Sequence, residues 1–254
     1  MTAAAGTLSD LNVLTRRYLR TTLGAKNLFN TVVTPLIFFL AFSFLLRHLL
    51  TERGVDFGQF FPPAIIVMSM GFTAMWTAYH LAQDRKTGLA ARLRTLPIAS
   101  GAVLTARLAA DTVQALGYLL VILLAGWVAG FSFQNGPLDT AGFVAVTVAF
   151  GLALALGAAA LGLRSRDPQA VSSLLFLPFL PLQFFSTAYV PLRDFPGWLQ
   201  PVVSVSPFTA VVGALRALST RGLAAAPVWE AAAWTVALIV IFGLAAARAW
   251  RVVT

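Results

Sequence analysis

Six long apolar stretches are the feature of this sequence that most restricts how it can fold. An α-helix needs about 20 predominantly apolar residues to cross the hydrocarbon core of a bilayer. A soluble domain has no use for so many separate runs of that length. The stretches are residues 28–46, 60–81, 104–131, 138–163, 170–190 and 228–250. We therefore expect an all-α integral membrane protein with six transmembrane helices.

Composition leaves no room for a large soluble domain. The chain has 254 residues, of which 59% are apolar and 11% are charged. A soluble domain of ordinary composition carries about 25% charged residues. Because the spans and their short connections use nearly the whole chain, we expect residues 1–254 to form a single transmembrane domain.

The distribution of Lys and Arg predicts the orientation in the membrane, because short cytoplasmic loops carry an excess of these residues. With the N-terminus in the cytoplasm, 13 of the 18 basic residues fall on the inner side, and an even number of spans returns the C-terminus there. We expect both termini to be cytoplasmic and the protein to lie in a bacterial plasma membrane among its lipids. The net charge of +9 then reflects topology, so nucleic acid is not an expected partner.

Residues 1–27 contain an amphipathic pattern. At helical spacing, Leu11, Leu14 and Tyr18 fall on one side, whereas Arg16 and Arg20 fall on the other. This pattern favours a helix lying in the membrane interface, an elbow before the first span. The alternative is a surface helix packed on protein.

The polar segment 83–99 joins the second and third spans. Thr87 is placed to cap a short helix, and Leu96-Pro97 ends it. A short helix with a small apolar face and basic flanks suits docking to a partner, although a solvated loop with positive-inside charges is the alternative. The candidate docking residues are Asp84, Arg85, Thr87, Gly88, Leu89, Arg92, Leu93, Leu96 and Pro97.

Residues 191–221 are too apolar for a free loop and too interrupted to cross the membrane. Phe195 and Trp198 stand among Pro196, Pro201 and Pro207. The remaining interpretation is a re-entrant or interfacial segment, with Trp198 at the level of the lipid headgroups.

Several polar and aromatic side chains lie inside the predicted spans. Arg107 and Asp111 are four residues apart on one helix face, which predicts a structural ion pair. Gln183 lies in a proline-kinked, phenylalanine-rich span, which suits either amphiphilic cargo or packing against lipid or a second subunit. The candidate pathway residues are Trp76, Tyr79, Phe179, Gln183 and Phe184.

The chain lacks the motifs of an ATPase or a hydrolase. No G-x-x-x-x-G-K-[ST] loop and no H-E-x-x-H is present. Its two histidines, His48 and His80, are predicted near opposite membrane faces, and it has no cysteine, so we expect no metal site. We therefore expect a protein that is not an enzyme and that binds no cofactor itself.

Several sequence blocks lie between and after the predicted spans. One block is the loop after the second span, and the others follow the third and fourth spans and fill the segment after the fifth. The blocks are Asp84–Gly88 with Leu93–Ile98, Gly130–Phe133, Arg166–Pro168, Val190–Leu199, Ser206–Thr209 and Ala214–Leu218. In this order they resemble the permeases of type-2 ABC exporters, and most closely the daunorubicin-resistance branch.

This resemblance implies partners and roles for the segments above. The segment 83–99 would form a coupling helix in a cleft of a separate ATPase subunit, present in two copies, which holds ATP and Mg. A second permease chain, identical or related, would complete a pathway between the first, second and fifth spans. Residues 191–221 would be extracellular re-entrant helices that cap the exit. The candidate lid residues are Phe195, Pro196, Trp198, Pro207 and Arg216.

The function that this resemblance implies is export. The chain would be the permease subunit through which a partner ATPase drives a hydrophobic or amphiphilic drug, antibiotic or lipid out of the cell. One alternative is a permease for lipid-linked polysaccharide, for which Trp76, Tyr79 and Tyr189 could stack on sugars. An alternative of another class is a membrane scaffold or regulatory subunit that transports nothing.

Overall fold

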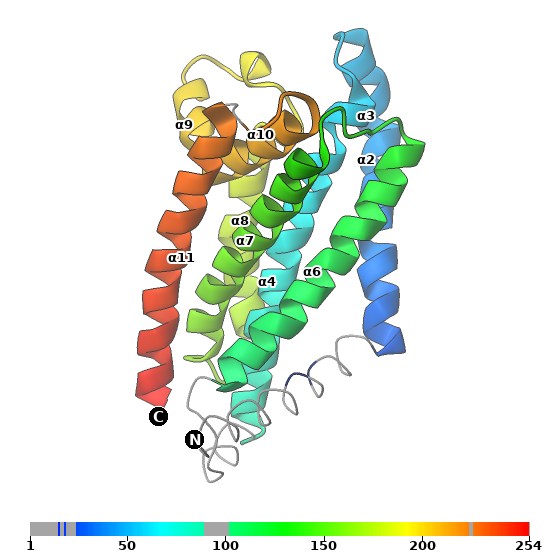
Figure 1. The fold of residues 1–254 in the computed structure, drawn as a ribbon. Coiled ribbons are helices and arrows are strands. Elements are labelled where there is room, and N and C mark those ends of the chain that lie inside the picture. The colour runs from blue at the N-terminus through cyan, green and yellow to red at the C-terminus, as the bar shows by residue number, and fades with distance from the viewer. Residues whose placement is uncertain (1–14, 16–17, 19–23, 89–101, 224–225, 254) are drawn as a thin grey trace.

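The computed structural model describes the whole chain except residues 1–14, 16–17, 19–23, 89–101, 224–225 and 254. Within the described residues all regular elements are helical, which confirms the all-α prediction (Figure 1). In chain order they are α2 (Ala25–Glu52), α3 (Phe57–Phe60), α4 (Pro62–Lys86), α6 (Ala102–Val128), α7 (Pro137–Gly162), α8 (Pro168–Phe184), η1 (Leu192–Asp194), α9 (Gln200–Val205), α10 (Pro207–Thr220) and α11 (Ala226–Val253).

Among the described residues, five helical segments are long and apolar enough to cross a membrane. They are Val32–Glu52, Phe57–Lys86, Leu104–Val128, Pro137–Gly162 and Ala226–Arg251. The chain is therefore a multi-pass membrane protein. The remaining predicted span, 170–190, coincides with α8, whose 17 residues are at the short end for a spanning helix.

The helix α8 ends at Phe184 and does not reach residue 190. Pro178 and Pro181 lie inside it and remove two backbone donors from its last turns. Beyond the helix, the Ser186 hydroxyl donates to the carbonyl of Gln183 at 2.5 Å. The amide of Thr187 donates to Thr209 Oγ1 at 3.1 Å, so the chain turns toward α10.

The helix α4 occupies the middle of the molecule and packs against α6, α7 and α8. Its buried face carries three hydroxyl groups, at Ser69, Thr73 and Thr77. Ser69 and Thr73 each donate to the carbonyl four residues earlier, at 2.8 and 3.1 Å. Buried hydroxyls that are hydrogen-bonded within their own helix carry little desolvation cost, so α4 tolerates them in an apolar interior.

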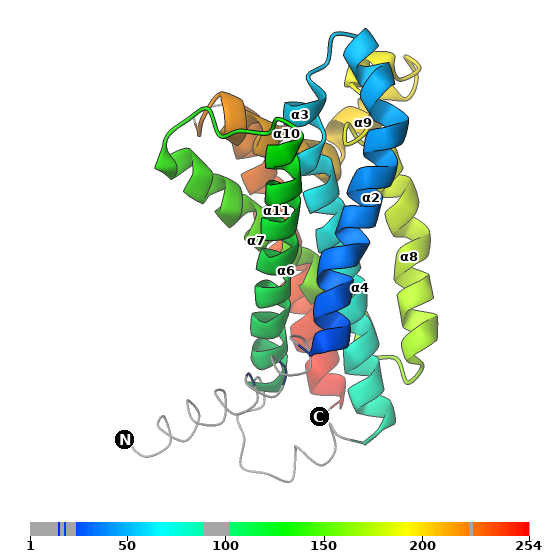
Figure 2. The ribbon, with the colours of Figure 1, turned by 90° about the vertical axis from the view of Figure 1, so that its right-hand side faces the viewer.

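The other long helices surround α4. The helix α7 packs against α4 on one side and α11 on the other, and α2 packs mainly against α6. Figure 2 shows α2 at the outside of the bundle, and its side chains Phe44 and Leu40 are 93% and 63% exposed. Exposed apolar surface of this kind suits contact with lipid or with another membrane helix.

The two ends of the bundle differ. The start of α2 and the ends of α4 and α11 lie at one end, together with the turn between α7 and α8 (Figures 1 and 2). The opposite end carries α3, α9 and α10. The helix α10 is embedded there, packed against α11, α7 and α4, with Val211, Leu215 and Leu218 fully buried.

Candidate functional site

A groove runs along the boundary between α4 and α8, and we call it the α4–α8 groove. Its volume is about 530 Å³. Residues on one face of each helix line it, because side chains three, four and seven positions apart share a helix face. The lining residues are Phe72, Met75, Trp76, Tyr79, Gln169, Ser172, Ser173, Phe176 and Leu177.

The two walls of the α4–α8 groove differ in chemistry. On α4, the rings of Trp76 and Tyr79 lie edge to face, with centroids 5.6 Å apart and an interplanar angle of 75°. Trp76 is 42% exposed, although it lies within a candidate span. The α8 wall adds the exposed polar residues Gln169 and Ser173. A groove with aromatic faces and a few polar groups can hold a planar amphiphilic molecule.

Trp76 and Tyr79 are therefore together in the groove, but Gln183 is not part of it. Gln183 is 1% exposed, and its Nε2 donates to the carbonyl of Ala64 and to the Tyr189 hydroxyl, both at 3.4 Å. Its amide joins α8 to the start of α4 inside one protomer. A polar residue in an apolar span is a natural candidate for binding cargo. Here its side chain instead supplies a hydrogen bond to a buried backbone carbonyl.

The two candidate phenylalanines also lie outside the α4–α8 groove. Phe179 is 7% exposed and packs between Phe72 and Phe208, with ring centroids 5.9 and 5.7 Å away. Phe184 is 49% exposed at the end of α8, where its ring lies 5.2 Å from that of Tyr189. Phe179 therefore belongs to the core, whereas Phe184 is half exposed outside the groove.

The groove also contains residues that were not among the pathway candidates predicted from the sequence. These are Phe72, Met75, Gln169, Ser172 and Ser173. The helical spacing of side chains on α4 and α8 could have indicated these residues. Phe72, Met75 and Tyr79 continue the face of Trp76 at helical spacing, and Gln169, Ser172 and Ser173 form the single polar face at the start of α8.

A buried ion pair lies on α6, beside α4. Arg107 Nη2 lies 2.7 Å from Asp111 Oδ1, and both side chains are 2% exposed. Thr77 on α4 donates its hydroxyl to Asp111 Oδ2 at 2.6 Å. The pair expected from the spacing is therefore present, and the additional hydrogen bond fastens α6 to α4. Such pairs set geometry more than they add stability.

Of the predicted elbow segment 1–27, the structure describes Thr15 and Tyr18, which are helical, and residues 24–27, where α2 begins. Tyr18 is 5% exposed. Its hydroxyl donates to Asp84 Oδ2 at 3.0 Å, and its ring centroid lies 5.8 Å from the guanidinium carbon of Arg107. Asp84, selected for docking to an ATPase, thus contacts the N-terminal segment.

The described start of the candidate docking segment continues and then ends α4. Arg85 Nη1 donates to the carbonyl of Leu163 at 2.6 Å, which binds α4 to the end of α7. Thr87 is the C-cap of α4, and its hydroxyl donates back to the Gln83 carbonyl at 3.0 Å. Gly88 has a φ of +70°, the left-handed conformation that favours glycine after a helix.

The helix expected to follow Thr87 lies among residues 89–101, outside the described part. The docking candidates that fall there are Leu89, Arg92, Leu93, Leu96 and Pro97.

Arg216, one of the candidate lid residues, is anchored to backbone groups of other segments. Its guanidinium donates to three backbone carbonyls, those of Phe60, Thr187 and Ala188, at 2.8 to 2.9 Å. It also lies 3.4 Å from the centroid of the Phe60 ring. Desolvation lowers the pKa of Arg216 to about 9, and the group stays charged at neutral pH. Arg216 therefore clamps α10 to the end of α3 and to the turn after α8.

The other candidate lid residues occupy different surroundings. Trp198 is 77% exposed, Pro196 is exposed, and Phe195 is half-buried. Pro207 begins α10 and lines an inner cavity. A salt bridge of 3.0 Å between Arg53 and Asp194 joins the end of α2 to η1, so this segment is fixed to the bundle at several points.

Within the described ranges, no group of three or more His, Asp or Glu side chains lies close enough to hold a metal ion.

The chain is similar to known ABC transporter proteins. The family model described as ABC-2 type transporter matches residues 9–219. The chain is 29% identical over 251 residues to the probable doxorubicin resistance ABC transporter permease protein DrrC of Mycobacterium tuberculosis, covering 97% of this chain and 88% of that protein.

Two further relatives carry related names. The chain is 30% identical over 246 residues to the doxorubicin resistance ABC transporter permease protein DrrB of Mycobacterium tuberculosis, covering 91% of this chain and 85% of that protein. It is 30% identical over 191 residues to the daunorubicin resistance ABC transporter permease protein DrrB1 of Streptomyces coeruleorubidus, covering 75% and 68% of the two chains.

Proposed function

Because this chain belongs to the ABC-2 type transporter family, we infer that it is the membrane permease of an ABC drug exporter. The drug-resistance names of its relatives favour transport over a purely structural or regulatory role. The cargo is a hydrophobic or amphiphilic molecule, and a partner ATPase supplies the energy.

One structural observation carries this proposal: a single helix joins the α4–α8 groove to the candidate docking segment. Trp76 and Tyr79 lie two to three turns before Lys86, where α4 ends. The segment 83–99 begins in the last turn of the same helix. A rigid helix transmits a push at its end to the side chains along it, so movement of the docking segment would change the width of the groove.

The mechanism follows from this connection. Closure of two ATPase subunits on ATP pushes the segment 83–99 and moves α4 against α8. The groove, closed over by a second permease chain, identical or related, changes its access from the inner to the outer side. The protein's own chemistry is recognition: Trp76 and Tyr79 stack on the cargo, and Gln169 and Ser173 meet its polar groups.

The proposed topology has six spans with both termini in the cytoplasm of a bacterial cell. The joint placement of the start of α2 and the end of α11 at one end of the bundle supports it (Figure 1). The helix α8 is then the fifth span, and its 17 residues are at the short end of the length that crosses a hydrocarbon core. The exposed Arg164 and Arg166 of the α7–α8 turn lie at the inner face, as the excess of basic residues requires.

The segment 191–221 is proposed as an outer, re-entrant cap. The 14 residues of α10 are too few to cross a bilayer, yet its apolar side chains are buried among spanning helices. A short apolar helix embedded in this way reaches into the membrane from one side only. Trp198, exposed beside it, suits the headgroup region.

The polysaccharide alternative loses part of its support. It relied on Trp76, Tyr79 and Tyr189 acting as a row of stacking aromatics. Tyr189 is 5% exposed, and its hydroxyl contacts the sulfur of Met68 inside the protomer at 3.2 Å. Of these three residues, Trp76 and Tyr79 line the groove and Tyr189 does not, which suits a compact drug better than a sugar chain.

The test is reconstitution with the cognate ABC ATPase in lipid vesicles. We expect planar amphiphilic drugs such as doxorubicin to stimulate ATP hydrolysis and to be moved across the vesicle membrane. Failure of any ATPase to co-purify with the chain would overturn the proposal. Stimulation by a lipid-linked oligosaccharide, with none by drugs, would favour the polysaccharide alternative.

A further inference from the structure

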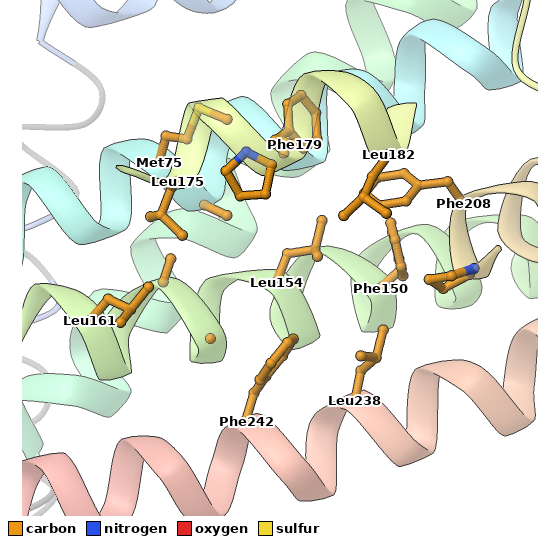
Figure 3. A pocket seen from close by; sticks show the side chains of 16 residues that line it. Met75, Phe150, Leu154, Leu161, Leu175, Phe179, Leu182, Phe208, Leu238 and Phe242 are labelled. Carbon is orange, nitrogen blue, oxygen red and sulfur yellow. The ribbon is translucent and has the colours of Figure 1, made fainter. Parts of the chain in front are cut away.

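A second cavity, which adjoins the α4–α8 groove at Met75, lies over α7 between α8 and α11, and we call it the α7 pocket. Its volume is about 260 Å³, and every residue that lines it is apolar. Figure 3 shows side chains of α8 facing those of α11 across Leu154 of α7. Its principal lining residues are Leu154, Leu161, Leu175, Leu182, Leu238 and Phe242.

One end of the α7 pocket is closed by aromatic rings. Phe208, in the first turn of α10, lies edge-on to Phe150 with ring centroids 5.5 Å apart. It also lies edge-on to Phe179, at 5.7 Å. These rings separate the pocket from the outer end of the bundle. Toward the other end, Leu161 is 37% exposed, so the pocket is open near the end of α7.

The depth and lining of the α7 pocket select its occupant. Leu154 and Leu238 lie in the middle of the candidate spans 137–162 and 226–251, which places the pocket within the hydrocarbon layer. Water, sugars and headgroups would be left without hydrogen-bond partners there. The molecule that fits this chemistry and surrounds the protein at this depth is the acyl chain of a lipid.

Positive charge stands at the open end. Arg164 follows α7 directly, three positions after Leu161, and is exposed. Arg248, in the last turns of α11, is exposed too. Leu163 and Ala249 belong to one apolar cluster, so both arginines lie at the same end of the bundle. Arg side chains at a membrane surface attract the phosphate of anionic lipids.

We propose that the α7 pocket holds an acyl chain of an anionic phospholipid, with the lipid phosphate at Arg164 and Arg248. This inference rests on the orientation given under the proposed function, and it adds a bound lipid as a working part of the permease. The helix α8 packs mainly on α4 and has few contacts with α7. A chain wedged beside α8 would hold it against α4 and set the width of the α4–α8 groove.

The experiment is photo-crosslinking in nanodiscs. The purified chain is placed in bilayers containing phosphatidylglycerol with a diazirine near the methyl end of one acyl chain. After illumination, labelled residues are mapped by mass spectrometry. We expect label on residues 150–161 of α7 and 238–242 of α11. The readout needs no ATP, drug or ATPase, so it can fail or succeed independently of the export assay.

Two matched variants of α11 test occupancy. Leu238→Trp fills the α7 pocket and should abolish the labelling of residues 150–161. Ile241→Trp adds the same ring at a position that is 58% exposed, outside the pocket, and should leave that labelling unchanged. Leu238→Ala enlarges the pocket, and residues 150–161 should still be labelled in this variant. This result would show that a change at position 238 does not by itself abolish labelling through misfolding.

Charge variants test the headgroup. Arg164→Gln combined with Arg248→Gln should reduce labelling by the phosphatidylglycerol probe severalfold, but not by a phosphatidylcholine with the same acyl chain. Equal labelling in the two tryptophan variants would mean ordinary annular lipid and would overturn the proposal. The absence of label on the α7 pocket would also overturn the proposal. That result is expected if a second copy of the chain covers the opening of the pocket.

Discussion

Arg216 is a cation that serves backbone groups, and its removal should be costly. It is the hydrogen-bond donor for the carbonyls of Phe60, Thr187 and Ala188. Arg216→Leu leaves these acceptors without their donor, and we expect a loss of about 3 kcal/mol of stability. Thermal unfolding in detergent measures it, with Arg221→Leu, at an exposed position of the same helix end, as the control. Equal melting temperatures for the two variants would contradict the clamp.

The buried pair of Arg107 and Asp111 should behave differently when one or both partners are removed. Arg107→Met leaves Asp111 buried opposite Thr77 without its cation, which should cost about 3–5 kcal/mol. The double variant Arg107→Met with Asp111→Leu removes both charges and should recover much of that loss. A double-mutant cycle by thermal unfolding checks this, and additive effects would argue against pairing.

Trp76 should matter to cargo and not to folding. Loss of an aromatic face is worth about 1–2 kcal/mol, so Trp76→Ala should raise the drug concentration for half-maximal ATPase stimulation about tenfold. Basal hydrolysis should not change. Trp127→Ala removes a tryptophan that is 73% exposed on α6, away from the α4–α8 groove, and serves as the control. The same shift in both variants would place the binding site elsewhere.

At the scale of elements, two glycines offer a matched test of the docking segment. Gly88 and Gly54 follow the ends of α4 and α2 with φ values of +70° and +72°, and neither has an atom within 4 Å of an added Cβ. Gly88→Trp and Gly54→Trp should therefore carry similar backbone strain. Only Gly88→Trp should abolish drug-stimulated ATP hydrolysis, because only Gly88 lies in the segment 83–99.

The contrast between these two variants is measured with the reconstituted complex. Membrane insertion and expression should be the same for both. Retention of coupling in Gly88→Trp would mean that the ATPase docks to another part of the inner face. Loss of coupling in both would point to strain alone.

At the scale of the whole molecule, the proposed topology can be tested cleanly because the chain has no cysteine. Arg166→Cys, in the α7–α8 turn, and Ser204→Cys, in α9, replace exposed residues at opposite ends of the bundle. In intact cells a membrane-impermeant maleimide should label Ser204→Cys and not Arg166→Cys. Inverted membrane vesicles should give the reverse, and the opposite pattern would invert the orientation.

Much of the candidate site depended on contacts between distant parts of the chain. Trp76 and Tyr79 could be selected from sequence because their rings stand out in an apolar helix. Gln183 and Phe179 stand out in the same way, yet they are buried against α4 and α10. Sequence periodicity gives the faces of one helix, but it does not say which neighbour covers each face. Arg216 was expected in a lid, and only the positions of three distant carbonyls make it a clamp.

Hydropathy along the chain was enough to predict an all-helical, multi-pass membrane protein and the approximate positions of its long helices. Hydropathy is a local property, since each span must satisfy its own backbone and meet lipid wherever the rest of the chain packs. The central position of α4, the end of α8 at Phe184, the α4–α8 groove and the α7 pocket became visible only in the folded chain. Those features depend on how helices pack side by side, and in an apolar chain many packings bury similar surface.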